Sequence, residues 1–266
     1  MHIDEIIEKI MPVDKECQQK AQDRFDALIK PLGSLAQLET MTSRYAAILG
    51  KYKKEDIDYP KRSLFVWSDM AHAKQAAQIM EGNYPVVPLA AETGAAVEAI
   101  LVTALDEEEA MEEGAGLVQE HIHKDKLGLV GFGCLAGADD ELVIAAMAGG
   151  ILQAAAMKIP VMLDGLATCL AAQKAVELAP AVIDYCFAGH VSLEAGAEEA
   201  LQKLGLTAPL RLNIPDGAGE GAAVAFTLFN AGIKSFKEME TFEEAGVHVE
   251  MKEFSLHEQV KKEKAK

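Results

Sequence analysis

The residues best placed to do chemistry lie in segment 210–226, where a β-prone run meets a glycine-rich turn and then an alanine-rich helical pattern. Gly217, Gly219 and Gly221 would let backbone N–H groups approach a ligand closely. The helix start would add unpaired N–H groups and its positive dipole end, which suit an anion such as phosphate. Glu220 lies inside this turn, where a carboxylate suits a general base better than a phosphate ligand. A tight turn whose glycines serve only packing is an equal alternative.

Two further loops place polar residues directly after strand-like runs. Asp164 follows the run 159–163, where it could orient a ligand or cap the next helix, and capping is the simpler interpretation. In the second loop His190, Ser192 and Glu194 alternate, and the last two are typical of a capped helix start. The sequence contains no Gly-x-Ser-x-Gly nucleophile elbow, which argues against a serine hydrolase.

Two other patterns invite cofactor hypotheses that the spacing does not support. His121 and His123 are two positions apart on a predicted helix, so their side chains point in different directions and are poor partners for one metal ion. Gly131, Gly133 and Gly137 do not complete a dinucleotide fingerprint. We therefore expect no metal site at these histidines and no nicotinamide dinucleotide site at these glycines.

The composition describes an acidic globular protein with a large core. The chain has 266 residues, half of them hydrophobic, and a formal net charge of −17. Such a charge disfavours nucleic acid and anionic membrane surfaces as partners. The four cysteines form no Cys-x-x-Cys pair, and no signal peptide or 20-residue apolar span is evident. We therefore expect a cytoplasmic protein with reduced thiols.

Hydrophobic patterning predicts an α/β fold. Continuous apolar runs separated by helical patterns indicate a mostly parallel sheet with helices on both faces. Ligands of such folds bind at the carboxyl ends of the strands. The expected strands cover 63–67, 127–132, 161–163, 184–187 and 210–214, and the expected helices 14–29, 35–49, 88–104, 107–123, 140–157, 166–178, 193–204 and 220–234.

Several motifs, in order, resemble the nicotinate-nucleotide:5,6-dimethylbenzimidazole phosphoribosyltransferase family, which makes the lower ligand of cobalamin. Residues 30–39 look like the family's Lys-Pro-x-Gly-Ser-Leu-Gly-x-Leu-Glu. Residues 144–149 and 160–165 look like its Ile-Ala-Ala-Met-Ala-Gly and Pro-Val-Leu-Leu-Asp-Gly pair. The likeness runs nearly throughout 140–247 and is good over 10–50.

The resemblance implies a three-layer α/β core, a small helical part built from both termini, and a homodimer. It divides the chain into a helical part over 1–55, a core domain over 56–247 and a tail over 248–266 that packs on the helical part or frays. The reaction it implies moves phosphoribose from nicotinate mononucleotide to a benzimidazole nitrogen. A turn glutamate acts as general base on that nitrogen, and no metal or organic cofactor takes part.

Site residues are carried over position by position. Without a gap, the family's catalytic glutamate falls on Ala218; with a two-residue deletion it falls on Glu220, the alignment we prefer. The resemblance then implies substrate contacts on the phosphate side and on the base side. These residues are Tyr84, Gly131, Gly133, Gly149, Asp164, Gly219 and Gly221.

The departures from the family pattern leave more than one function open. Residues 130–137 carry no carboxylate and no Asn-Thr-Thr where the family has both, and several tens of residues that usually follow are missing. The first hypothesis is an active phosphoribosyltransferase with a reduced site. The alternative is a catalytically impaired member that binds a base or riboside as a sensor or carrier, or that supports an active paralogue as a partner subunit.

Overall fold

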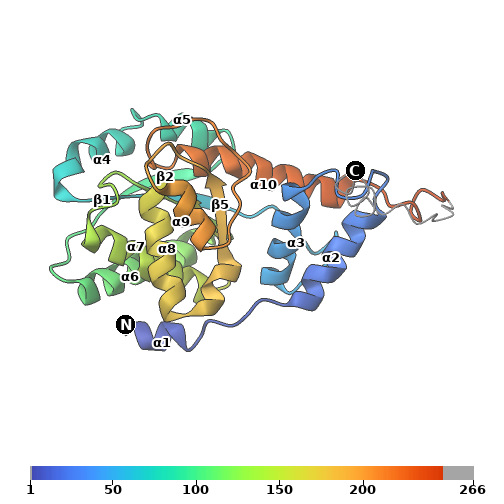
Figure 1. The fold of residues 1–266 in the computed structure, drawn as a ribbon, viewed down its shortest axis with the longest axis horizontal. Helices are drawn as coiled ribbons and strands as arrows, with labels where there is room; N and C mark the ends of the chain where they lie inside the picture. The colour runs from blue at the N-terminus through green and yellow to red at the C-terminus, as the bar shows by residue number, and fades with distance from the viewer. Residues whose placement is uncertain (1, 248–266) are drawn as a thin grey trace, which may run out of the picture.

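A five-stranded sheet forms the centre of the protein, and every strand pairing in it is parallel. The computed structural model describes residues 2–247 (Figure 1). The sheet order is β2 (Ala96–Leu101), β1 (Arg62–Ser68), β3 (Leu129–Cys134), β4 (Val161–Asp164) and β5 (Cys186–His190). All strands except the edge strand β2 are buried along their whole length, as expected for strands covered on both faces.

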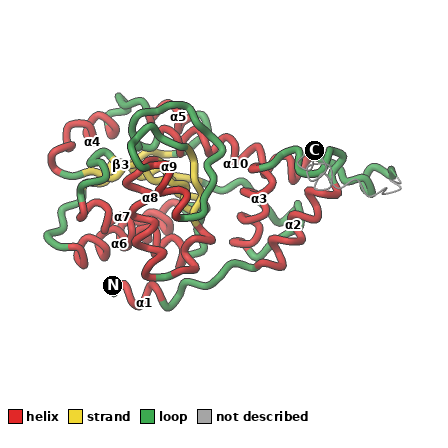
Figure 2. The backbone as a smooth tube through the Cα atoms, in the orientation of Figure 1, coloured by secondary structure: helices red, strands yellow, loops and turns green. Residues whose placement is uncertain are grey.

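Helices cover both faces of the sheet, so the predicted three-layer α/β fold is confirmed (Figures 1 and 2). Long helix α10 packs on β3, β4 and β5, and α7 and α8 pack on the sheet as a neighbouring pair. Within the described residues no helix is both long and apolar enough to cross a membrane. The helices are α1 (Ile3–Ile7), α2 (Lys15–Ala27), α3 (Gln37–Leu49), α4 (Ala73–Met80), α5 (Val86–Ala91), α6 (Glu107–Asp125), α7 (Glu141–Ala156), α8 (Gly165–Leu178), α9 (Ala197–Lys203) and α10 (Glu220–Glu238), with short 3-10 turns η1 (Met70–His72) and η2 (Pro180–Tyr185).

Helices α2 and α3 pack with the later part of α10 and project to one side of the sheet (Figure 1). Asp14 caps α2 as expected by accepting the N–H of Cys17. Arg44 of α3 donates to the backbone carbonyls of Ile183, Asp184 and Cys186 at the start of β5. One guanidinium therefore joins this helical part to the sheet. Predicted tail 248–266 lies outside the described residues.

Two sequence-based expectations are wrong. Residues 96–101 form edge strand β2, although we expected a helix over 88–104. The alanines of the wider stretch 88–104 favoured a helix, but Val97 and Ile100 suit a strand, and residues 96–101 pair with β1. Residues 210–214 form no strand beyond a single bridge between Leu210 and His190. Asn213 has a left-handed backbone with φ of 59°, which interrupts an extended run.

Gly149 lies in the middle of α7, where it allows close packing against α6. A Cβ added there would stand 1.9 Å from the carbonyl oxygen of Met111 in α6. Gly114 of α6 faces Ala146 of α7 in the same way, at 1.8 Å. The two helix backbones thus meet through glycines, and the substrate contact expected for Gly149 is not supported by its position.

Substituting Gly149 with alanine should destabilise the protein, because the added methyl group would collide with backbone rather than with a movable side chain. Overpacking of this kind typically costs about 1–3 kcal/mol. Gly116→Ala is the matched control, since nothing lies within 4 Å of a Cβ there, and helix propensity should even favour it. Urea unfolding of both variants measures the difference, and equal stability would contradict the packing role.

Candidate functional site

The glycine turn before α10 docks directly on the carboxyl end of β3. The N–H of Cys134 donates to the carbonyl oxygen of Gly217 at 2.7 Å. A Cβ at Gly133 would lie 2.4 Å from the backbone nitrogen of Gly219, which itself has φ of 109°. Gly133 and Gly219 are therefore brought together as expected, and close backbone approach explains why both are glycine.

Asp164 caps α10 rather than the helix that follows it in sequence. Its Oδ2 accepts the N–H of Gly221 at 2.8 Å, inside the first turn of α10. The Asp164 side chain makes no capping hydrogen bond to α8, the helix that follows it in sequence. Instead, Glu194 Oε2 accepts the N–H of Leu166 and the hydroxyl of Ser192, both at 2.7 Å. Asp164 therefore caps a helix, as the sequence indicates, but that helix is α10 and not α8.

Glu220 is the first residue of α10 and only 7% exposed. Burial raises its pKa to about 7, and the charges of Asp216 and Asp164 add to this, while its own backbone N–H opposes it. Its Oε2 is buried and makes no hydrogen bond within residues 2–247. A buried carboxyl group that titrates near neutral pH suits general-base chemistry.

Tyr84 lies in the loop before α5 and within electrostatic reach of the same carboxylates. Partial burial raises its pKa, and the charges of Glu220 and Asp216 raise it further. The structure therefore brings Tyr84 and Glu220 into one neighbourhood. Within the described part of the chain, no lysine or arginine forms an ion pair with Glu220, Asp216 or Asp164.

Gly131 lies between the sheet and α10, next to the Leu64 side chain that also faces Gly219. A Cβ there would meet the side chains of Leu64 at 2.6 Å and Phe226 at 2.8 Å, between the sheet and α10. Gly131 thus allows α10 to pack closely on the sheet, and this position does not support the substrate contact that we expected. Of the predicted site residues, Tyr84, Gly133, Asp164, Gly219, Glu220 and Gly221 gather at the carboxyl edge of the sheet. Gly131 lies under α10, and Gly149 lies at the contact between α6 and α7.

One group of side chains elsewhere has the composition of a metal site. Ligand atoms of Glu98, His121 and Asp125 lie within 4.8 Å of one another. Glu98 Oε2 is 3.1 Å from His121 Nε2, whereas Asp125 Oδ2 is 3.9 Å from Nδ1. Because the carboxylates approach opposite ring nitrogens, the arrangement suits pairing with the imidazole better than shared coordination of one ion. His123 is exposed, away from this group.

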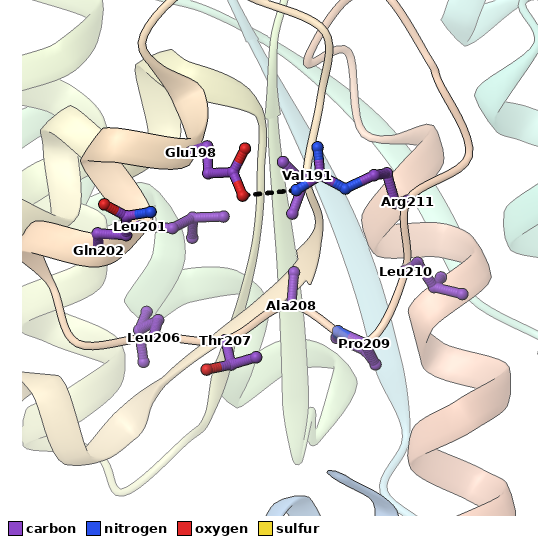
Figure 3. Close-up of a pocket in the computed structure, with 10 residues that line it drawn as sticks. All are labelled: Val191, Glu198, Leu201, Gln202, Leu206, Thr207, Ala208, Pro209, Leu210 and Arg211. Atoms are coloured by element: carbon purple, nitrogen blue, oxygen red, sulfur yellow. Dashed lines mark hydrogen bonds and ion pairs between the residues drawn. The ribbon is translucent and has the colours of Figure 1, made fainter. Parts of the chain in front are cut away.

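A cavity of about 300 Å³ lies between α9 and the segment 206–211 (Figure 3). Its walls are mostly apolar, and an ion pair of 2.6 Å between Arg211 and Glu198 crosses it. None of the predicted site residues lines it.

Sequence reasoning missed the roles of His190 and Glu194. Both were noticed as polar residues after a strand, but their partners are distant in the chain. Glu194 bonds Leu166 across 28 positions, and His190 Nε2 accepts the N–H of Leu212 across 22 positions. The alternation of polar residues over 190–194 was the available signal, and it does not reveal such partners.

Comparison with known proteins matches this chain to a family model described as phosphoribosyltransferase, over residues 10–125 and 89–247. The chain belongs to this family. Its relatives include the nicotinate-nucleotide–dimethylbenzimidazole phosphoribosyltransferase of Geotalea uraniireducens, 29% identical over 92% of this chain and 98% of that protein. The enzyme of the same name from Citrifermentans bemidjiense is 47% identical over 106 residues, which are 40% of this chain and 30% of that protein.

The fold is also that of solved family structures. CobT from Thermus thermophilus superposes with a TM-score of 0.78 over 88% of this chain and 99% of that chain, at 21% identity. The alignment with the Geotalea protein spans 347 positions, more than the 266 residues of this chain. The relative therefore contains segments that this phosphoribosyltransferase-family chain lacks.

The raised pKa of Glu220 predicts a pH dependence of folding. The unfolded group has an ordinary pKa of 4.5, and the folded one about 7. The folded state therefore holds the proton more tightly, so the free energy of unfolding should fall as pH rises from about 4.5 to about 7. By the usual conversion of pKa units, this fall is on the order of 3 kcal/mol.

Glu220→Gln should remove that fall, and urea unfolding of both proteins at pH 5, 6, 7 and 8 measures it. Glu199→Gln, at an exposed position of α9, is the control and should keep the wild-type profile. Parallel profiles for wild type and Glu220→Gln would show that Glu220 is not held in a desolvated site.

Proposed function

We propose that the protein transfers phosphoribose from nicotinate mononucleotide to 5,6-dimethylbenzimidazole or a related base, a step in making the cobalamin lower ligand. Family membership and the names of its relatives support this reaction. The observation that carries the proposal is Glu220, a buried carboxyl group with a pKa of about 7 at the carboxyl edge of the sheet.

In this reaction a ring nitrogen of the benzimidazole forms a bond to C1 of the ribose. The bond between C1 and the nicotinate nitrogen breaks, and the electron pair of that bond leaves with nicotinate. The acceptor nitrogen becomes positively charged unless its ring loses the N–H proton, which Glu220 takes up. A base with a pKa near the working pH is well matched to this transfer. Tyr84, which lies near Glu220, would contact the aromatic base.

Glu220→Gln should keep the fold and lower kcat by about a hundred-fold or more, the usual size of a general-base contribution. In the wild type, kcat should rise with pH through about 7, because only the deprotonated carboxylate accepts the proton. Steady-state assays from pH 5.5 to 8.5 measure both effects. Asp216→Asn is the control; unchanged turnover in Glu220→Gln together with a loss in Asp216→Asn would transfer the role to Asp216.

Nicotinate mononucleotide should bind weakly, with a Kd in the high micromolar range or above. Backbone N–H groups of the turn can hold a phosphate, but they are neutral donors and lack the strength of charge-assisted hydrogen bonds. The carboxylates of Asp164 and Asp216 place negative charge close to the same turn. A neutral benzimidazole should bind near Tyr84 and Glu220 without this difficulty. Calorimetry with each ligand separately measures the difference, and a nucleotide Kd on the order of 10 µM or better would overturn it.

We also propose a cytoplasmic homodimer. The family resemblance supports the dimer, and the four free buried cysteines are consistent with a reducing compartment. Sedimentation at micromolar concentration should give roughly twice the 28.6 kDa chain mass. A monomer at that concentration would contradict this proposal. It would also exclude a second subunit of the dimer as a source of phosphate contacts.

A further inference from the structure

The imidazole of His190 connects both ends of the loop that leads into Glu220. Its Nε2 accepts the N–H of Leu212 at 2.9 Å, near the beginning of the loop. Its Nδ1 lies 3.7 Å from Oδ1 of Asp164, whose Oδ2 accepts the N–H of Gly221 at the far end. The side chains of His190 and Asp164 are both completely buried. The His190–Asp164 pair thus contacts both the loop at Leu212 and the start of α10 at Gly221.

The hydrogen bond from Leu212 fixes the ring chemistry of His190. An imidazole nitrogen that accepts an N–H carries no proton, so in the neutral ring the proton is on Nδ1. That nitrogen faces the Asp164 carboxylate, and the separation of 3.7 Å makes the contact electrostatic. Protonating Nε2 would convert it from an acceptor into a donor facing the Leu212 N–H. The neutral tautomer and the loop position therefore depend on each other.

The first turn of α10 rests directly on this pair. A Cβ at Gly221 would lie 2.3 Å from Asp164 Oδ1 and 2.4 Å from His190 Cβ. Asp164 and His190 also face each other in the register of β4 and β5. Movement of the imidazole would therefore be transmitted to the backbone next to Glu220.

We propose that His190 is a positioning residue for this reaction: it braces Leu212 directly and Gly221 through Asp164, and so sets where the Glu220 carboxylate stands. The inference rests on the proposed role of Glu220 as the base. His190 itself touches no substrate, and it acts through the backbone of the loop.

Two substitutions separate the two contacts of the ring. In His190→Gln the side chain is long enough for its amide oxygen to replace Nε2 and accept the Leu212 N–H. In His190→Asn the amide reaches only the Nδ1 position, so the bond to Leu212 is lost. We expect His190→Gln to keep kcat within about three-fold, and His190→Asn to lose ten-fold or more in kcat with less than a two-fold change in KM for the base. His121→Gln, a partly buried histidine on α6, is the matched control.

Two measurements do not depend on turnover. Carboxyl NMR of Glu220 should show a titration midpoint that moves in His190→Asn and stays in place in His190→Gln and His121→Gln. Amide exchange of Leu212 should be slow in the wild type and in His190→Gln, and fast in His190→Asn. If no form of the protein transfers phosphoribose, the proposed function fails, while these two measurements still decide the role of His190.

The proposal is overturned if a folded His190→Asn keeps the wild-type kcat and Glu220 midpoint, or if both variants lose kcat and raise KM together. Where His190→Asn does not fold, the wild type and His190→Gln decide. Slow exchange of the Leu212 amide in both proteins, with the same Glu220 titration midpoint in both, supports the positioning role of His190. Rapid exchange of the Leu212 amide in the wild type rejects it.

Discussion

The site depends on a buried hydrogen bond from the N–H of Gly221 to the carboxylate of Asp164. A negative charge at a helix start is favourable, so this carboxylate stabilises the first turn of α10. The same charge lies close enough to Glu220 to disfavour a second negative charge there, and it contributes to the raised pKa of that group. Asp164 thus places the proposed base, and its charge adds to the effects of burial and of Asp216 on the pKa of Glu220.

This constraint explains which glycines the site needs. At position 221 any side chain would collide with Asp164 and His190, and at position 133 it would collide with the turn before α10. Gly131 and Gly149 also lie in glycine-containing motifs, but they serve close packing. Gly131 faces Leu64 of β1 and Phe226 of α10, and Gly149 faces the Met111 backbone of α6. Sequence spacing does not separate these two uses, because the distinction depends on which element crosses the glycine in three dimensions.

The sequence was most informative where burial is complete. Strands β1, β3 and β4 are apolar along their length because both faces are covered, and their positions were predicted within a few residues. Edge strand β2 is partly exposed, and the alanines in and around it favoured a helix in the local pattern. Glu220 and Asp164 were found through their motifs, but the hydrogen bond from Gly221 to Asp164 spans 57 positions and could not be read from either motif.

Carboxylates of the chain itself occupy three of the helix starts at the carboxyl edge of the sheet, those of α7, α8 and α10. Asp140 accepts two N–H groups at the start of α7, Glu194 accepts one at α8 and Asp164 one at α10. A phosphate reaching these positions would meet negative charge instead of free N–H groups, which reverses the usual advantage of a helix start. The donor phosphate would therefore be held away from these three helix starts, and the turn at Gly219 offers backbone N–H groups next to Glu220. The geometry that buries and tunes Glu220 is thus the same geometry that limits how strongly this chain alone can hold a nucleotide.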